Sequence, residues 1–160
     1  MRWIWIDKFT QFAPGKSATA IKCVTLAEEH LHDLYPDFPI VPHSLIVEGM
    51  AQTAGILVGE ASQFREKVIL AKVGRATFHR LARPGDTLVF EARIEQFSEQ
   101  GASASGTVRI GGELLAEIEL MFSHIDRNMA GMAFPEHNFV FTDQFKQVLG
   151  TCRSDAPISL

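Results

Sequence analysis

Most of the residues that could carry chemistry lie in the stretch LHDLYPDFPIVPHSLIVEGMAQTAG, residues 31–55. A single carboxylate, Glu48, stands in an apolar run there, and Gln52 follows it four residues later. Residues four apart share one face of a helix, so Gln52 can hold Glu48 by a hydrogen bond. The start of a helix favours a negative charge and burial opposes it, a balance that suits a proton-transferring carboxylate. A structural carboxylate paired with an arginine fits the same pattern.

Three histidines near Glu48 could act as general bases. His43 directly precedes the helix expected to carry Glu48, where it could serve as a cap, a surface residue, or a general acid or base. His30 and His32 are expected on an exposed loop, which favours solvated surface roles. Taken alone, each histidine favours the ordinary structural explanation.

Several other kinds of site are not indicated. The spacings repeat no zinc pattern, and no glycine-rich phosphate loop, G-x-S-x-G elbow or dinucleotide-binding fingerprint occurs. Cys23 and Cys152 are too few and too far apart for a disulfide framework, which favours the cytoplasm. The start of the chain does not fit a signal peptide, and no apolar run reaches the roughly 20 residues of a membrane span. The net charge of −4 argues against a nucleic-acid protein.

A basic cluster stands out in this acidic chain. Its members are Lys72, Arg75, Arg80 and Arg83. A solvated strand face is the ordinary explanation, and the functional one is a docking patch for a phosphate or an acidic partner.

One long helix and several strands must position these residues. Residues 44–61 predict a helix of about four to five turns, apolar nearly all round, as a buried helix is. Its three glycines suggest close packing against another backbone. Alternating patterns predict strands at 17–25, 67–74, 75–82, 87–97, 102–110 and 113–125, with a further short strand or helix lead at 2–9.

These elements predict an α+β fold, with a curved antiparallel sheet wrapped around one central helix. In the strand at 113–125 we expect Leu115 on the polar face with the glutamates. The exposed edges of such a sheet favour pairing into a dimer. Residues 1–126 are expected to form the domain, and 127–160 a linker, a short helix and a loose end. That helix is predicted at 141–150, with Thr142 as its N-cap and Gly150 past its end.

The segment FPIVPHSLIVEGMAQTAG resembles the signature of the FabZ-type 3-hydroxyacyl-acyl-carrier-protein dehydratases. PGKSATAIKCVT before it and AKVGRATFHRLARPGDTL after it agree, so the resemblance spans about residues 3–125. It implies a hotdog fold and a homodimer with two sites at the subunit interface, in some members a hexamer of three dimers. The family removes water from a 3-hydroxyacyl chain on acyl carrier protein to give the trans-2-enoyl product in fatty acid synthesis. No metal or organic cofactor is used.

The family's catalytic pair is a histidine and a carboxylate from opposite subunits. Glu48 matches the carboxylate, and Gln52 matches a supporting glutamine. The histidine is expected fourteen residues before the carboxylate, in a His-Phe-Pro run, and this chain has Leu34-Tyr35-Pro36 there. A leucine cannot take a proton.

Two glycines of the family motif are also replaced. His43 stands where a glycine is expected to polarise the thioester carbonyl through its backbone N–H, and Asp37 replaces the glycine after Pro36. The resemblance assigns substrate contacts to Gln52, Leu34, Tyr35 and Pro36. It assigns docking of the acidic carrier to Lys72, Arg75, Arg80 and Arg83.

Three hypotheses follow. In the first, the protein is a working dehydratase whose base has moved to His43 or His32. In the second, Glu48 acts alone, as base or nucleophile, in an acyl thioesterase. In the third, the protein binds acyl-carrier or acyl-coenzyme A thioesters without turnover, for instance as the partner of an active homologue in a mixed dimer. The first is favoured because most of the motif, including Glu48, remains.

Overall fold

The computed structural model describes residues 3–128 and 134–150. The last ten residues, which we expected to be loose, lie outside these ranges, as does Cys152. The elements in chain order are β1 (Lys8–Ala13), β2 (Ser17–Cys23), α1 (His30–Asp33), α2 (His43–Ala61), β3 (Val68–Phe78), β4 (Thr87–Phe97), β5 (Gly101–Ile110), β6 (Glu113–His124), α3 (Ile125–Asn128) and α4 (Asp143–Gly150).

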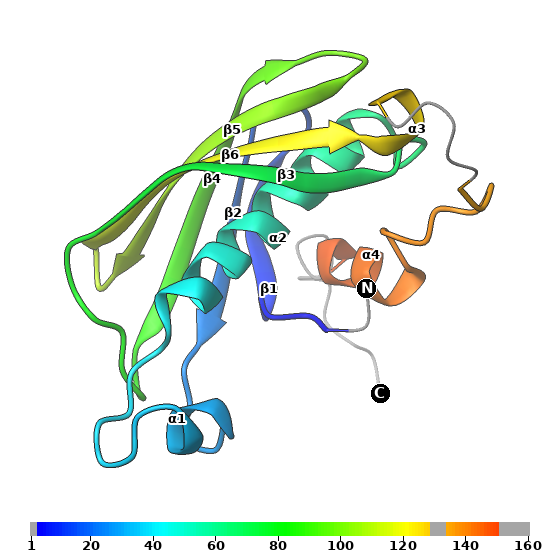
Figure 1. Ribbon diagram of the computed structural model, residues 1–160. Helices are drawn as coiled ribbons and strands as arrows, with labels where there is room; N and C mark the ends of the chain where they lie inside the picture. Colours follow the sequence, from blue (N-terminus) through cyan, green and yellow to red (C-terminus); the bar gives the residue numbers. More distant parts are fainter. Residues whose placement is uncertain (1–2, 129–133, 151–160) are drawn as a thin grey trace, which may run out of the picture.

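The strands form one six-stranded sheet in the order β1-β2-β4-β5-β6-β3. Every neighbouring pair is antiparallel. The sheet curves around α2, which lies along its concave face (Figure 1). This arrangement confirms the α+β fold that the sequence predicts. No helix within the described residues is long and apolar enough to cross a membrane.

Helix α2 is the centre of the core, and every residue from Gly49 to Gly59 is buried. The glycines do allow close packing, but their neighbours are aromatic rings rather than backbone. A Cβ at Gly49 would collide with the ring of Phe90 on β4, and one at Gly59 would collide with the ring of Phe141. Because glycine has no Cβ, both rings can lie directly against the helix.

Three strand predictions differ from the structure. The two strands predicted at 67–74 and 75–82 are one strand, β3, which stays paired with β6 through two register shifts. β1 begins at Lys8, so most of residues 2–9 precede it. Leu115 is buried rather than on the polar face, because a register shift between β5 and β6 turns both Leu115 and Ala116 inward.

The C-terminal helix α4 belongs to the same hydrophobic core. Thr142 caps it as predicted, since the backbone N–H of Phe145 donates to Thr142 Oγ1 at 3.3 Å. Gly150 falls within the helix rather than past its end. The apolar side chains of this region are continuous with the main cluster, and they include Phe141, Phe145, Val148 and Leu149. α4 lies beside β1, close to the start of the chain (Figure 1).

Candidate active site

Glu48 lies in the second turn of α2 and is half-buried. Gln52 Nε2 donates to Glu48 Oε1 at 2.8 Å, as the spacing of four residues predicts. Gln52 itself is 2% exposed, so its amide needs a partner for each polar atom. The carboxylate therefore has one oxygen held by a buried amide.

An N-terminal strap, residues 3–7, fixes the orientation of Gln52. The backbone N–H groups of Trp5 and Ile6 donate to Gln52 Oε1 at 2.8 and 3.4 Å. Gln52 Nε2 donates to the carbonyl oxygen of Trp3 at 3.2 Å as well as to Glu48. Since backbone N–H groups can only donate, the oxygen of the Gln52 amide must face the strap and its NH₂ must face Glu48. Sequence reasoning missed this role of the strap.

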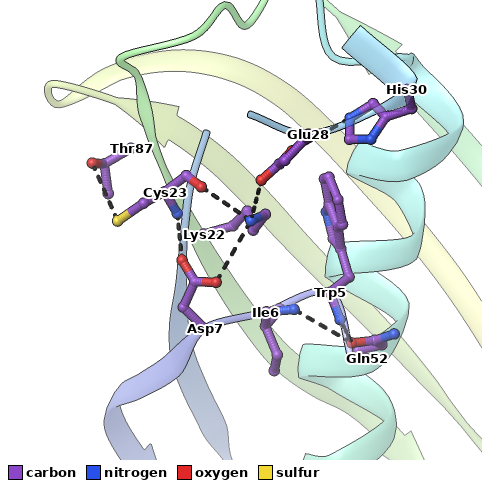
Figure 2. A network of polar contacts seen from close by, with 9 residues as sticks. All are labelled: Trp5, Ile6, Asp7, Lys22, Cys23, Glu28, His30, Gln52 and Thr87. Atoms are coloured by element: carbon purple, nitrogen blue, oxygen red, sulfur yellow. Dashed lines mark hydrogen bonds and ion pairs between the residues drawn. The ribbon is translucent and has the colours of Figure 1, made fainter. Parts of the chain in front are cut away.

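The strap is anchored by the buried ammonium of Lys22 on β2 (Figure 2). Lys22 Nζ donates to Glu28 Oε1 at 2.6 Å and lies 3.6 Å from Asp7 Oδ1. Asp7 Oδ2 also accepts the backbone N–H of Cys23 at 2.6 Å, and Lys22 lies over the Trp5 ring at 4.7 Å. In SATAIKC the lysine occupies an inward position of the alternating pattern. A lysine at such a position needs buried partners, so this position was a signal that could have revealed the network, and sequence reasoning did not use it.

His30 and His32 both lie on the short helix α1, and only His32 is exposed. The prediction of an exposed His30 was wrong, because its ring packs edge-on against Trp5 at 5.3 Å. His30 Nε2 lies 3.4 Å from Glu28 Oε2. The Trp5 side chain extends from the region of Gln52 toward His30 (Figure 2). His32 Nε2 contacts the carbonyl oxygen of Leu26 at 2.5 Å, away from this network.

His43 is the first residue of α2 and is exposed. Its ring stacks on Phe78, with centroids 3.9 Å apart and planes at 2°. Five residues of helix separate it from Glu48 by about 7.5 Å along the axis and about 140° around it. Among the described residues, no hydrogen bond or ion pair joins a histidine to Glu48, whose contact is Gln52. A single chain therefore does not bring His43 and Glu48 together.

The loop before α2 exposes a cluster of apolar side chains. Leu34 is 54% exposed, and Tyr35 and Phe38 are 46% exposed. Pro36 is also exposed, and Asp37 has a φ of 65°, in the left-handed region that favours glycine. The glycine that the resemblance implies at the position of Asp37 would adopt this backbone conformation without strain. A backbone hydrogen bond joins this loop to the segment that follows β3. The N–H of Val41 donates to the carbonyl oxygen of Ala82 at 2.9 Å.

An apolar cavity of about 170 Å³ lies next to Glu48. Its walls come from α2, from the start of β3, from Phe122 on β6, and from Val140, Phe141 and Phe145 near the C-terminus. Glu48 and Gln52 are the polar residues of this lining. A carboxylate at the edge of an apolar cavity suits a ligand with a reactive polar group and a hydrocarbon tail.

Two of the four residues of the basic cluster form ion pairs with glutamates of strand β6. Arg75 Nη2 bonds Glu119 Oε1 at 2.7 Å across the β3–β6 pair, and Arg80 pairs with Glu113. These contacts correspond to the ordinary explanation, a solvated strand face. The guanidinium of Arg83 lies 4.8 Å from the centroid of the Phe38 ring, and Lys72 is exposed on β3. Within residues 3–128 and 134–150, no group of three metal-ligating side chains is arranged to hold an ion.

Comparison with known proteins identifies the family. A FabA-like domain profile matches residues 3–119. The 3-hydroxyacyl-[acyl-carrier-protein] dehydratase FabZ of Caldanaerobacter subterraneus subsp. tengcongensis is 36% identical over 121 residues, covering 75% of this chain and 86% of that protein. The FabZ of Clostridioides difficile (strain 630) is 32% identical over 126 residues, covering 78% and 89%.

Solved structures share the fold at lower identity. The dehydratase heterocomplex ApeI:P from Xenorhabdus doucetiae matches with a TM-score of 0.64 and 15% identity, over 76% of this chain and 82% of that chain. The protein PA5202 from Pseudomonas aeruginosa matches with a TM-score of 0.60 and 16% identity, over 72% and 86%. The architecture is thus the hotdog fold, and the chain belongs to the FabZ-like family of 3-hydroxyacyl-[acyl-carrier-protein] dehydratases.

Proposed function

We propose that the protein dehydrates 3-hydroxyacyl thioesters at a site shared by two subunits, with Glu48 from one and His43 from the other. The observation that carries this proposal is the carboxylate of Glu48, oriented by a buried amide beside an apolar cavity. The membership of the chain in a family of hydro-lyases supports the same reaction.

Glu48 serves as the acid in this proposal. Because Gln52 Nε2 donates to Glu48 Oε1, that oxygen takes the role of the carbonyl and the proton belongs on Oε2. Oε2 then gives its proton to the hydroxyl on C3 of the substrate, while a base removes a proton from C2. The C3–O bond breaks, the C2–C3 double bond forms, and water leaves.

His43 serves as the base because Leu34 has no group that takes a proton. Helix geometry directs His43 away from Glu48 of its own chain, so in this proposal the pair forms across two subunits. The family resemblance also places the two catalytic groups on opposite subunits. As the first residue of α2, His43 has a backbone N–H without an intrahelical acceptor, suited to the thioester carbonyl oxygen. Leu34, Tyr35 and Pro36 would contact the substrate beside it.

A homodimer completes this site. β3 is a free edge of the sheet and exposes Ile69, Leu70 and Val73. An exposed apolar edge strand is suited to pairing with another chain. The apolar loop around Leu34 would be covered by the same association, and a hexamer of three such dimers would repeat the same site. An isologous dimer contains two copies of each composite site.

We assign the carrier as acyl carrier protein, as in the names of the relatives, and the docking surface to Lys72, Arg75, Arg80 and Arg83. Arg83 and Lys72 are the principal contacts, because Arg75 and Arg80 are already paired with glutamates. An acidic partner can still approach all four, since the ion pairs of Arg75 and Arg80 lie at the surface and are weak. The exposed thiol of Cys23 is compatible with a reducing cytoplasm.

A second candidate function follows from Leu34. A subunit that lacks the histidine of the family motif can still contribute Glu48 to a mixed dimer. In that dimer an active homologue supplies the base. In that case the purified chain binds thioesters and turns none over until the homologue is added.

The test is one assay with three readouts on the purified protein. It receives 3-hydroxyacyl- and enoyl-acyl carrier protein, and double-bond formation, free acid release and binding are followed together. Reversible hydration that Glu48→Gln removes supports the proposal, with Glu60→Gln on the same helix as the control. Acid release identifies a thioesterase, and binding without turnover identifies the non-catalytic partner. If the protein shows no turnover and no binding, all three functions are contradicted.

A further inference from the structure

We propose that residues 138–149, here called the C-terminal cap, close the cavity beside Glu48 and restrict the site to short acyl chains. This inference rests on the proposed function and names its substrate class. The matched family domain ends at residue 119, so the cap lies outside the part of the chain that defines the family.

The cap closes the cavity with packed phenylalanine rings. Phe141 is 3% exposed, and its ring lies against α2 at the place where a Cβ on Gly59 would stand. Phe145 stacks on it, with centroids 6.2 Å apart and planes at 7°, and Phe64 meets it edge-on at 5.1 Å. Rings held on three sides form a rigid wall rather than a movable flap.

Asn138 holds the cap against the segment that follows α2. Its Nδ2 donates to the carbonyl oxygens of Phe64 and Glu66, both at 3.0 Å. Its Oδ1 accepts the backbone N–H groups of Val140 and Phe141, both at 3.1 Å. Both N–H donors and both acceptor positions of the Asn138 amide are therefore used. These hydrogen bonds hold the backbone of Phe141 in place, so that its ring forms part of the cavity wall.

The volume that remains is small. The cavity holds about 170 Å³. An apolar cavity of about 150 Å³ binds one benzene molecule, so a cavity of this size has room for about six carbon atoms. The other walls are α2, β3 and β6, which are elements of the common fold. Without the rings of Phe141 and Phe145 the cavity would continue along α2, past Gly55 and Gly59.

The experiment measures chain-length preference without relying on turnover. Binding of S-butyl, S-hexyl, S-octyl and S-dodecyl coenzyme A thioethers to the full chain is measured, and dehydration of 3-hydroxyacyl thioesters of matching lengths is followed in parallel. The affinity of the unmodified protein should rise about fourfold per methylene up to hexyl and then level off or fall. Phe141→Ala and the milder Phe141→Leu should move the optimum to octyl or longer.

Two further variants control for misfolding. Val140→Phe narrows the same cavity and should move the optimum from hexyl to butyl. Phe139→Ala changes a neighbouring, more exposed ring outside the cavity and should leave the preference unchanged. An unchanged optimum in folded Phe141→Leu or in Val140→Phe overturns the proposal, as does a protein that binds no thioether. A chain-length preference without dehydration contradicts the catalytic proposal alone.

Discussion

The side chain of Gln52 connects the backbone of Trp5 to the carboxylate of Glu48. Its Oε1 accepts the Trp5 N–H at 2.8 Å, and its Nε2 donates to Glu48 Oε1 at 2.8 Å. The strap therefore determines which atom of Gln52 faces the carboxylate. The position of the reacting group depends in this way on a segment more than forty residues away in sequence.

Gln52→Glu is expected to damage both activity and stability. The new carboxylate can still accept the N–H groups of Trp5 and Ile6, but it has no donor for Glu48. Two carboxylate oxygens would then face each other without a hydrogen bond between them. We expect a loss of about 2 kcal/mol in unfolding free energy and at least a tenfold drop in kcat/KM, as for a displaced catalytic group. Urea unfolding and a hydration assay measure the two. Gln96→Glu, exposed on β4, should behave as the parent protein.

Lys22→Met is expected to loosen the strap. The substitution leaves Asp7 and Glu28 beside each other without the cation, and removal of one partner from such a network costs about 2 kcal/mol or more. Lys16→Met, exposed between β1 and β2, is the matched control. Equal unfolding midpoints for the two variants would show that the Lys22 network does not hold the structure.

Leu34→His is expected to raise the rate of dehydration. Leu34 is 54% exposed, so the substitution should change stability by less than about 0.5 kcal/mol. A general base contributes about 100-fold or more when it is correctly placed. Adding Leu34→His to the His43→Ala variant, which lacks the proposed base, should therefore raise the rate at least tenfold. Leu26→His, on a neighbouring exposed segment, should give no gain. The same absence of gain in Leu34→His would show that the pocket cannot use a base at this position.

The sequence predicted the elements with strong periodicity and missed contacts between distant segments. The long helix and β4 have almost the predicted bounds, because apolar spacing along one element reports its own burial. Leu115 was misplaced because the register shift depends on pairing with β5, which the alternation within β6 does not record. The N-terminal strap and the C-terminal cap act through contacts across the fold. Glu48 and Gln52 were found because four residues of one helix separate them.

The central claim is that His43 and Glu48 act together from opposite subunits, and subunit complementation tests it most directly. His43→Ala and Glu48→Gln are purified separately, each expected to be inactive in hydration, with His32→Ala as an active control. When the two inactive variants are mixed and allowed to exchange subunits, half of the dimers are mixed and each has one intact site. Activity should therefore return to about one quarter of the parent value. No recovery after proven exchange, or full activity of His43→Ala alone, would contradict the account.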